Sequence, residues 1–99
     1  MLEEFTVETF GGRVGDRFRI SADESVIVEA ILMEATAAGA AESSLGVRAP
    51  FALVFRGPLE PILPQRIYRF EHDALGAFDL FIVPIGPDER GMQYEAVFA

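Results

Sequence analysis

His72, the only histidine of the chain, is the residue whose type most directly suggests chemistry. It lies in the run Glu71-His72-Asp73, and a histidine beside carboxylates can bind a metal or act as a general base. Successive residues of a strand point to opposite faces, so Glu71 and His72 cannot readily hold one ion, and a third ligand must come from elsewhere. We therefore expect His72 to end a strand and to hydrogen-bond the backbone of the turn that follows.

Nucleophilic catalysis has little support in the sequence. A Ser-His-Asp triad could be assembled from Ser43 or Ser44 with His72 and Asp73, but no Gly-x-Ser-x-Gly turn is present to expose the serine. The chain has no cysteine, which excludes disulfides, zinc–thiolate sites and cysteine nucleophiles. No lysine follows Gly11-Gly12 or Gly86-Pro87, so neither segment predicts a phosphate loop. The sequence therefore predicts no enzyme, no bound metal and no cofactor.

Two arginines are candidates for a ligand site. Arg56 follows an apolar run over residues 51–55, and Arg69 lies on the charged face of a predicted strand. We favour ion pairs with carboxylates on neighbouring strands, for which the candidates are Glu71, Asp79 and Glu95. The alternative keeps both arginines free to form, with His72, the polar rim of a ligand pocket. The acidic pairs at 23–24 and 88–89 lie in predicted turns, where we expect solvation rather than catalysis.

Length and charge narrow the class of protein. A chain of 99 residues with 51% apolar residues is expected to form one domain, 1–99, with a packed core. Its net charge is −8, and its eight basic residues are arginines spread along the chain, which argues against nucleic acid and anionic membranes as partners. No apolar run reaches the roughly 18 residues of a membrane span. The first residues are acidic, unlike a signal peptide, so we expect a cytoplasmic protein.

Alternation of apolar and polar residues between turn residues predicts a mainly β chain. The predicted strands cover residues 17–20, 25–35, 51–55, 67–71, 77–83 and 92–98, and turns are expected at 21–24, 72–76 and 86–91. A phase shift at residues 31–34 predicts a bulge in the second strand, although a helix over 29–41 is the competing interpretation. The residues expected in the core are Phe18, Ile20, Val28, Leu53, Phe55, Tyr68, Phe70, Leu80, Ile82, Tyr94 and Phe98.

A short helix is predicted before the first strand. Thr6 is a suitable N-cap, Val7, Phe10 and Val14 would share one apolar face, and the helix should end by Gly15. Phe5 could pack back onto the helix as a hydrophobic staple. With this helix, five to six antiparallel strands form a small barrel or roll, and closure would remove the exposed strand edges.

Two other segments break the strand pattern. Residues 57–64 contain three prolines and should be extended, with Leu59, Ile62 and Leu63 covering an open end of the barrel. Residues 37–49 are rich in Ala, Gly and Ser and predict a mobile loop. The residues expected to bind a partner there are Leu45, Val47 and Arg48.

Several short motifs carry a resemblance to a known family. They are Leu-Pro-Gln at 63–65, Tyr68, Glu-His at 71–72, Leu-Gly at 75–76, Leu-Phe-Ile-Val-Pro-Ile-Gly at 80–86 and Tyr-Glu-Ala-Val-Phe at 94–98. In these motifs the chain resembles an uncharacterised family of small bacterial domains of unknown function. The resemblance covers nearly the whole chain except residues 37–49, and it implies no activity and no cofactor. It also implies a place beside phage-tail-like proteins, which favours a role in an assembly.

Together these observations predict a non-enzymatic interaction or structural module, a component of a phage-tail-like or other multiprotein assembly. We expect a protein partner or self-association, and neither nucleic acid nor a membrane as partner. The alternative is a small-molecule-binding barrel with a polar rim near Arg56, Arg69 and His72. The long variable loop at 37–49 favours the first interpretation, and nine phenylalanines available to fill the barrel weigh against the second.

Overall fold

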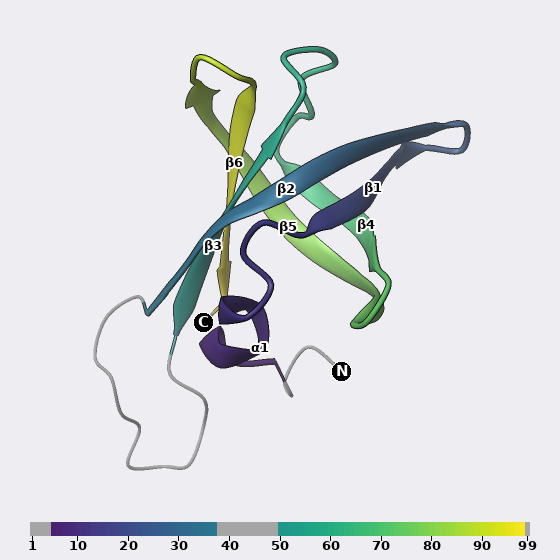
Figure 1. Cartoon of the computed structure of the whole chain (residues 1–99). Helices are drawn as coiled ribbons and strands as arrows, with labels where there is room; N and C mark the ends of the chain where they lie inside the picture. Colours follow the sequence, from purple (N-terminus) through teal and green to yellow (C-terminus); the bar gives the residue numbers. More distant parts are fainter. Residues whose placement is uncertain (1–4, 38–49, 99) are drawn as a thin grey trace.

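The chain folds into a closed antiparallel β-barrel of six strands with one short helix (Figure 1). The computed structural model describes residues 5–37 and 50–98. The elements in chain order are α1 (Val7–Gly11), β1 (Arg17–Asp23), β2 (Val26–Ala37), β3 (Phe51–Gly57), β4 (Arg66–His72), β5 (Gly76–Pro87) and β6 (Met92–Phe98). The strand order is β1-β2-β3-β6-β5-β4, and every neighbouring pair is antiparallel. The predicted fold class is confirmed.

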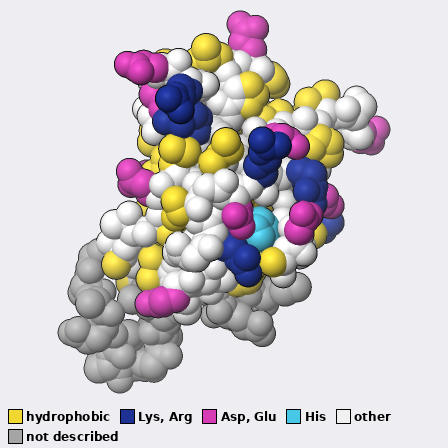
Figure 2. Space-filling view, viewed as in Figure 1, with side chains coloured by type: hydrophobic (Ala, Val, Ile, Leu, Met, Phe, Trp, Pro, Cys, Tyr) yellow, Lys and Arg dark blue, Asp and Glu magenta, His cyan; other side chains and the backbone are white. Residues whose placement is uncertain are grey.

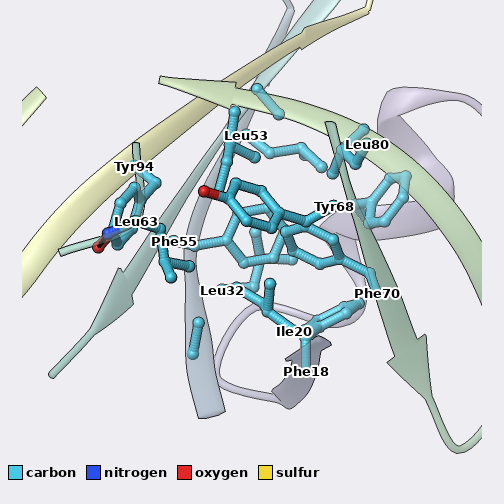
Figure 3. Close-up of a cluster of buried hydrophobic side chains, with 14 of the residues drawn as sticks. Phe18, Ile20, Leu32, Leu53, Phe55, Leu63, Tyr68, Phe70, Leu80 and Tyr94 are labelled. Atoms are coloured by element: carbon cyan, nitrogen blue, oxygen red, sulfur yellow. Dashed lines mark hydrogen bonds between the residues drawn. The ribbon is translucent and has the colours of Figure 1, made fainter. Parts of the chain in front are cut away.

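Alternation along the strands places the predicted core inside the barrel (Figure 3). All eleven residues expected to be buried are buried, and β3 shows why, since every second residue from Phe51 to Gly57 faces inward. The core also contains residues that the alternation alone did not single out, among them Phe10, Phe51 and Phe78. None of the described helices is long and apolar enough to cross a membrane.

Helix α1 is attached to one end of the barrel by its aromatic residues. Thr6 is the N-cap as predicted, and it forms a capping box with Thr9. Phe5 packs edge-on against Phe10, with ring centroids 5.3 Å apart, which confirms the predicted staple. The expectation for Val14 is wrong: the helix ends at Gly11, and Val14 is 50% exposed. The glycines at 11 and 12 end the helix before a second turn can form.

Strand β2 is bent where the sequence predicted a bulge. Its pairing with β3 shifts register between Leu32 and Glu34, and the competing helix is not formed. At the same place the loop after α1 continues the ladder, because Gly15 N donates to Leu32 O at 2.8 Å and Leu32 N donates to Asp16 O at 3.1 Å. The bulge therefore lies where β2 changes partners from β1 to this loop.

Strands β1 and β5 extend by several residues beyond their predicted ends. Strand β1 continues to Asp23, so the expected turn at 21–24 is shorter, and the Asp23 carboxylate accepts hydrogen bonds from the N–H groups of Ser25 and Val26. Strand β5 runs past the predicted 77–83 to Pro87, with a bulge between Pro84 and Gly86. Its first part pairs with β4 and its last part with β6, which is how this long strand helps to close the barrel.

Of the three residues expected to cover the core from the proline-rich segment between β3 and β4, only Leu63 does so. Leu63 is buried, and its N–H donates to the hydroxyl of Tyr94 at 2.9 Å, while the Tyr68 hydroxyl donates to Pro64 O at 2.7 Å. Leu59 and Ile62 are about half exposed, so their predicted role is wrong. The tyrosine hydroxyls anchor the chain only at residues 63–64, and the two other side chains face outward. The predicted loop at 37–49 falls, apart from Ala37 at the end of β2, outside the described residues.

Candidate functional site

Five of the seven arginines in the described part of the chain gather around two neighbouring hollows on the outside of the barrel. We call this surface the arginine face; its arginines are Arg13, Arg17, Arg19, Arg56 and Arg90. The acidic residues that line the hollows are Asp16, Glu29 and Asp73. Figure 2 shows basic side chains spread over this face with acidic ones between them. A locally basic surface thus lies on a protein whose net charge is −8.

The first hollow, of about 500 Å³, lies across the outer faces of β1, β2 and β3. Arg17 on β1 is opposite Ile31 on β2, and Ile31 is opposite Arg56 on β3. Opposite residues of antiparallel strands point to the same side, so this row places an isoleucine between two guanidinium groups. The full lining is Arg17, Glu29, Ile31, Arg56, Gly57, Pro58 and Arg90.

Arg56 is held in place by Asp88 of the turn between β5 and β6. Both Nε and Nη2 of Arg56 donate to Asp88 Oδ2, the first at 2.8 Å, and Nη1 contacts the Met33 sulfur at 3.6 Å. The other carboxylate oxygen accepts from the N–H groups of Arg90 and Gly91 at 2.8 and 2.9 Å. The Arg56 hydrogen bonds, followed by that of the Arg90 N–H, lower the pKa of Asp88. Asp88 therefore fixes both Arg56 and the turn that carries Arg90.

Arg17 and Arg90 are the more available basic groups of the first hollow. The Arg17 guanidinium lies 3.9 Å from Glu29, and the two side chains are 72% and 62% exposed, so this ion pair is loose and solvated. Arg90 forms no ion pair with any residue in the described part of the chain. These two side chains can reorient toward a ligand, whereas Arg56 cannot do so without releasing Asp88.

The second hollow, of about 410 Å³, adjoins the first and shares Arg17 and Glu29 with it. Arg19 spans its far side, with ion pairs to Glu71 at 3.6 Å and to Asp73 at 3.2 Å. Arg13, in the loop after α1, also lines it and pairs with no acidic group among the residues with assigned positions. The basic surface therefore continues beyond the first hollow.

His72 lies at the base of the second hollow and uses both ring nitrogens. Nδ1 accepts from the N–H groups of Ala74 and Leu75, each at 3.1 Å, and Nε2 lies 2.8 Å from Asp16 Oδ2. Because Nδ1 accepts two hydrogen bonds, the proton of the neutral ring is on Nε2 and is donated to Asp16. The ring is almost fully buried against Phe18. The predicted bonds to the following turn are confirmed, and neither nitrogen is free for a substrate.

The residues named from the sequence as a ligand rim do not meet in one place. Arg56 lines the first hollow and His72 the second, while Arg69 lines neither and lies 3.9 Å from Asp79 across β4 and β5. The pairing expected for Arg69 is therefore confirmed. For Arg56 the expected partners are wrong, because it pairs with Asp88, which lies in a turn rather than on a neighbouring strand.

The other sequence candidates give no assembled site. Asp73 pairs with Arg19 rather than with His72, and the serines at 43 and 44 lie outside the described residues. The same holds for the expected partner-binding residues Leu45, Val47 and Arg48. Across residues 5–37 and 50–98 no group of three or more His, Asp or Glu side chains could hold a metal ion.

Sequence reasoning missed Arg17, Arg90 and Asp88. Asp88 had a local signal, since Asp-Glu-Arg-Gly at 88–91 is typical of a tight turn in which the aspartate accepts backbone N–H groups. Arg17 and Arg90 had none, because they come from opposite ends of the chain and meet only through the pairing of the strands between them.

Comparison with known proteins gives a family and no relative of known activity. No curated protein and no solved structure matches the chain. The model of a domain of unknown function (DUF6916) matches residues 5–98, which include every element of the barrel and the arginine face. The chain therefore belongs to this family of domains of unknown function.

Proposed function

We propose that this domain is a non-enzymatic interaction module that binds a protein partner through the arginine face. One observation carries the proposal. Asp88 fixes Arg56 and the backbone of the turn that contains Arg90, while the Arg90 side chain has no ionic partner among the described residues. The fixed turn backbone and Arg56 lower the conformational entropy that is lost on binding, while the Arg90 side chain can still turn toward a charged partner.

The inside of the barrel gives no comparable support to a ligand site. Nine large side chains of the strands are fully buried there, and several meet ring to ring, such as Phe18 and Phe55 at 5.3 Å (Figure 3). A six-stranded barrel filled in this way offers its outer surface for recognition. His72 does not offer a ligand contact either, because both of its ring nitrogens already form hydrogen bonds with the protein's own turn and loop.

A small-molecule-binding barrel is the second candidate, and one observation favours it. The first hollow, at about 500 Å³, has the volume of many small-ligand sites. It is, however, an open depression on the outside of the sheet rather than the mouth of the barrel, so a small ligand would stay largely in water.

The resemblance to domains found beside phage-tail-like proteins supports the first proposal. On this basis we propose that the domain is a component of a bacterial multiprotein assembly in the cytoplasm.

Site-specific photo-crosslinking tests the proposal. A photoreactive residue at Glu29, between the two hollows, is compared with the same residue at Asp79 on the outer face of β5; the two side chains are 62% and 64% exposed. We expect a covalent adduct with another polypeptide from Glu29 and none from Asp79 after irradiation of the producing cells. Equal adducts from both positions, or none from either, would contradict binding through this face.

A further inference from the structure

We infer that the first hollow binds the carboxylate of a glutamate in an acidic polypeptide segment, which continues over the second hollow. The inference rests on the proposed function and names the chemistry of the partner. Its first support is the lining, where three arginines meet one acidic residue, Glu29. A planar guanidinium presents paired N–H donors that match the two oxygens of a carboxylate.

The donors reach one hollow from three places in the fold, β1, β3 and the turn between β5 and β6. Arg17 and Arg90 line the same hollow, and Arg56, which lies in the strand row with Arg17, is kept there by Asp88. A carboxylate entering the hollow would draw Arg17 from its loose contact with Glu29 at 3.9 Å and would give Arg90 an ionic partner. Arg56, which is already paired with Asp88, stays in place and forms one wall of the hollow.

The apolar part of the lining points to a glutamate rather than to an isolated anion. Ile31, which is 36% exposed, lies between Arg17 and Arg56 in the strand row, and Pro58 completes the apolar surface. The methylene groups of a glutamate can pack on Ile31 while the carboxylate reaches the guanidinium groups. A free inorganic anion would leave this apolar surface in water.

The adjoining second hollow favours a segment with several carboxylates. Exposed ion pairs contribute little individually, so useful affinity needs a series of them on one chain. Arg17 is shared by both hollows, and Arg13 follows in the second, again without an ionic partner among the described residues. The net charge of −8 repels an acidic segment from the remaining surface and so restricts it to this face.

Titration of the full chain, labelled with ¹⁵N, tests this inference by NMR. The probes are a capped oligoglutamate peptide, the matching oligoglutamine peptide and inorganic phosphate. We expect oligoglutamate to shift the amide signals of Arg17, Ile31, Arg56 and Arg90, and oligoglutamine to shift none. The double variant Arg17→Gln/Arg90→Gln should weaken binding roughly tenfold or more. The control Arg66→Gln/Arg69→Gln removes the same charge away from the hollows and should bind as the parent does.

Each other outcome overturns the inference. Equal weakening in the control variant would mean that binding depends on total charge only. Phosphate that shifts the same signals with the affinity of oligoglutamate would assign a small-anion site instead of a polypeptide site. Absence of oligoglutamate binding would also overturn it, while an adduct from the Glu29 photo-crosslinker would still leave the proposed function standing. Unchanged signals from the core of each variant show that the variants are folded.

Discussion

A side-chain carbon added at Gly91 would overlap with the carbonyl oxygen of Gly57. This contact brings the turn between β5 and β6 directly onto the end of β3, and the Asp88 N–H donates to Gly91 O at 2.8 Å within that turn. Gly57 belongs to the lining of the first hollow, and Arg90 precedes Gly91. The arrangement of the hollow therefore depends on a place where two backbones meet without a side chain between them.

Gly91→Ala should destabilise the domain by about 1–3 kcal/mol, because the methyl group meets backbone that has little room to move. Gly57→Ala is the matched control. A carbon added at Gly57 has its nearest neighbours at 3.6 Å, an ordinary contact distance, so this variant should stay within about 1 kcal/mol of the parent. Urea denaturation measures both. Equal stability of Gly91→Ala and the parent would show that the β5–β6 turn can move away from the end of β3 without loss of stability.

Asp88→Asn should reduce stability at neutral pH and leave it unchanged in acid. Hydrogen bonds from Arg56 hold the pKa of Asp88 below its ordinary value of 3.8. A carboxylate with a lowered folded-state pKa stabilises the fold above the unfolded value, and this contribution is lost as the pH falls through the folded-state pKa. The difference between parent and variant should thus close on acidification. The control Glu89→Gln removes the neighbouring charge and leaves the hydrogen bonds between Arg56 and Asp88 in place, so at neutral pH it should stay within about 0.5 kcal/mol of the parent. A difference between Asp88→Asn and the parent that stayed constant on acidification would contradict the mechanism.

His72→Ala should cost about 1–3 kcal/mol of stability, because the N–H groups of Ala74 and Leu75 lose their acceptor. His72→Asn should recover part of this loss, since an asparagine oxygen can accept the same bonds in a turn. Thermal unfolding compares the variants. NMR of the neutral imidazole of the parent should show the proton on Nε2; a proton on Nδ1 would overturn the assignment.

Phe10→Ala should cost about 3–5 kcal/mol, because Phe10 is fully buried and joins α1 to the barrel. Its ring lies 6.0 Å from that of Phe51 and 5.7 Å from that of Phe98, so a cavity would open where three elements meet. Val14→Ala is the control: the helical periodicity places Val14 with Phe10, but the structure exposes it, and we expect little change. Chemical denaturation measures the stability of both variants. Equal losses of stability in Phe10→Ala and Val14→Ala would mean that Val14 is buried on a longer helix, as the sequence suggested.

The barrel itself could be predicted from local pattern. Alternation from Tyr68 to Glu71 and from Tyr94 to Phe98 marks the buried face of each strand, because a period of two follows from strand geometry and needs no knowledge of partners. The cap at Thr6 and the bonds from the turn to His72 are also local, since each joins residues close in sequence. These features were accessible from the order of the residues.

The arginine face depends on which strands become neighbours. Arg17 and Arg56 share a row because both pair with Ile31, and Arg90 joins them because the β5–β6 turn packs on Gly57. Nothing local distinguishes Arg17 and Arg56 from Arg69, which also lies on the outer face of a strand but pairs with Asp79 outside the hollows. Charged side chains on an outer barrel face are free of the burial constraint that orders the core, so their neighbours follow from register and closure, which are properties of the whole sheet.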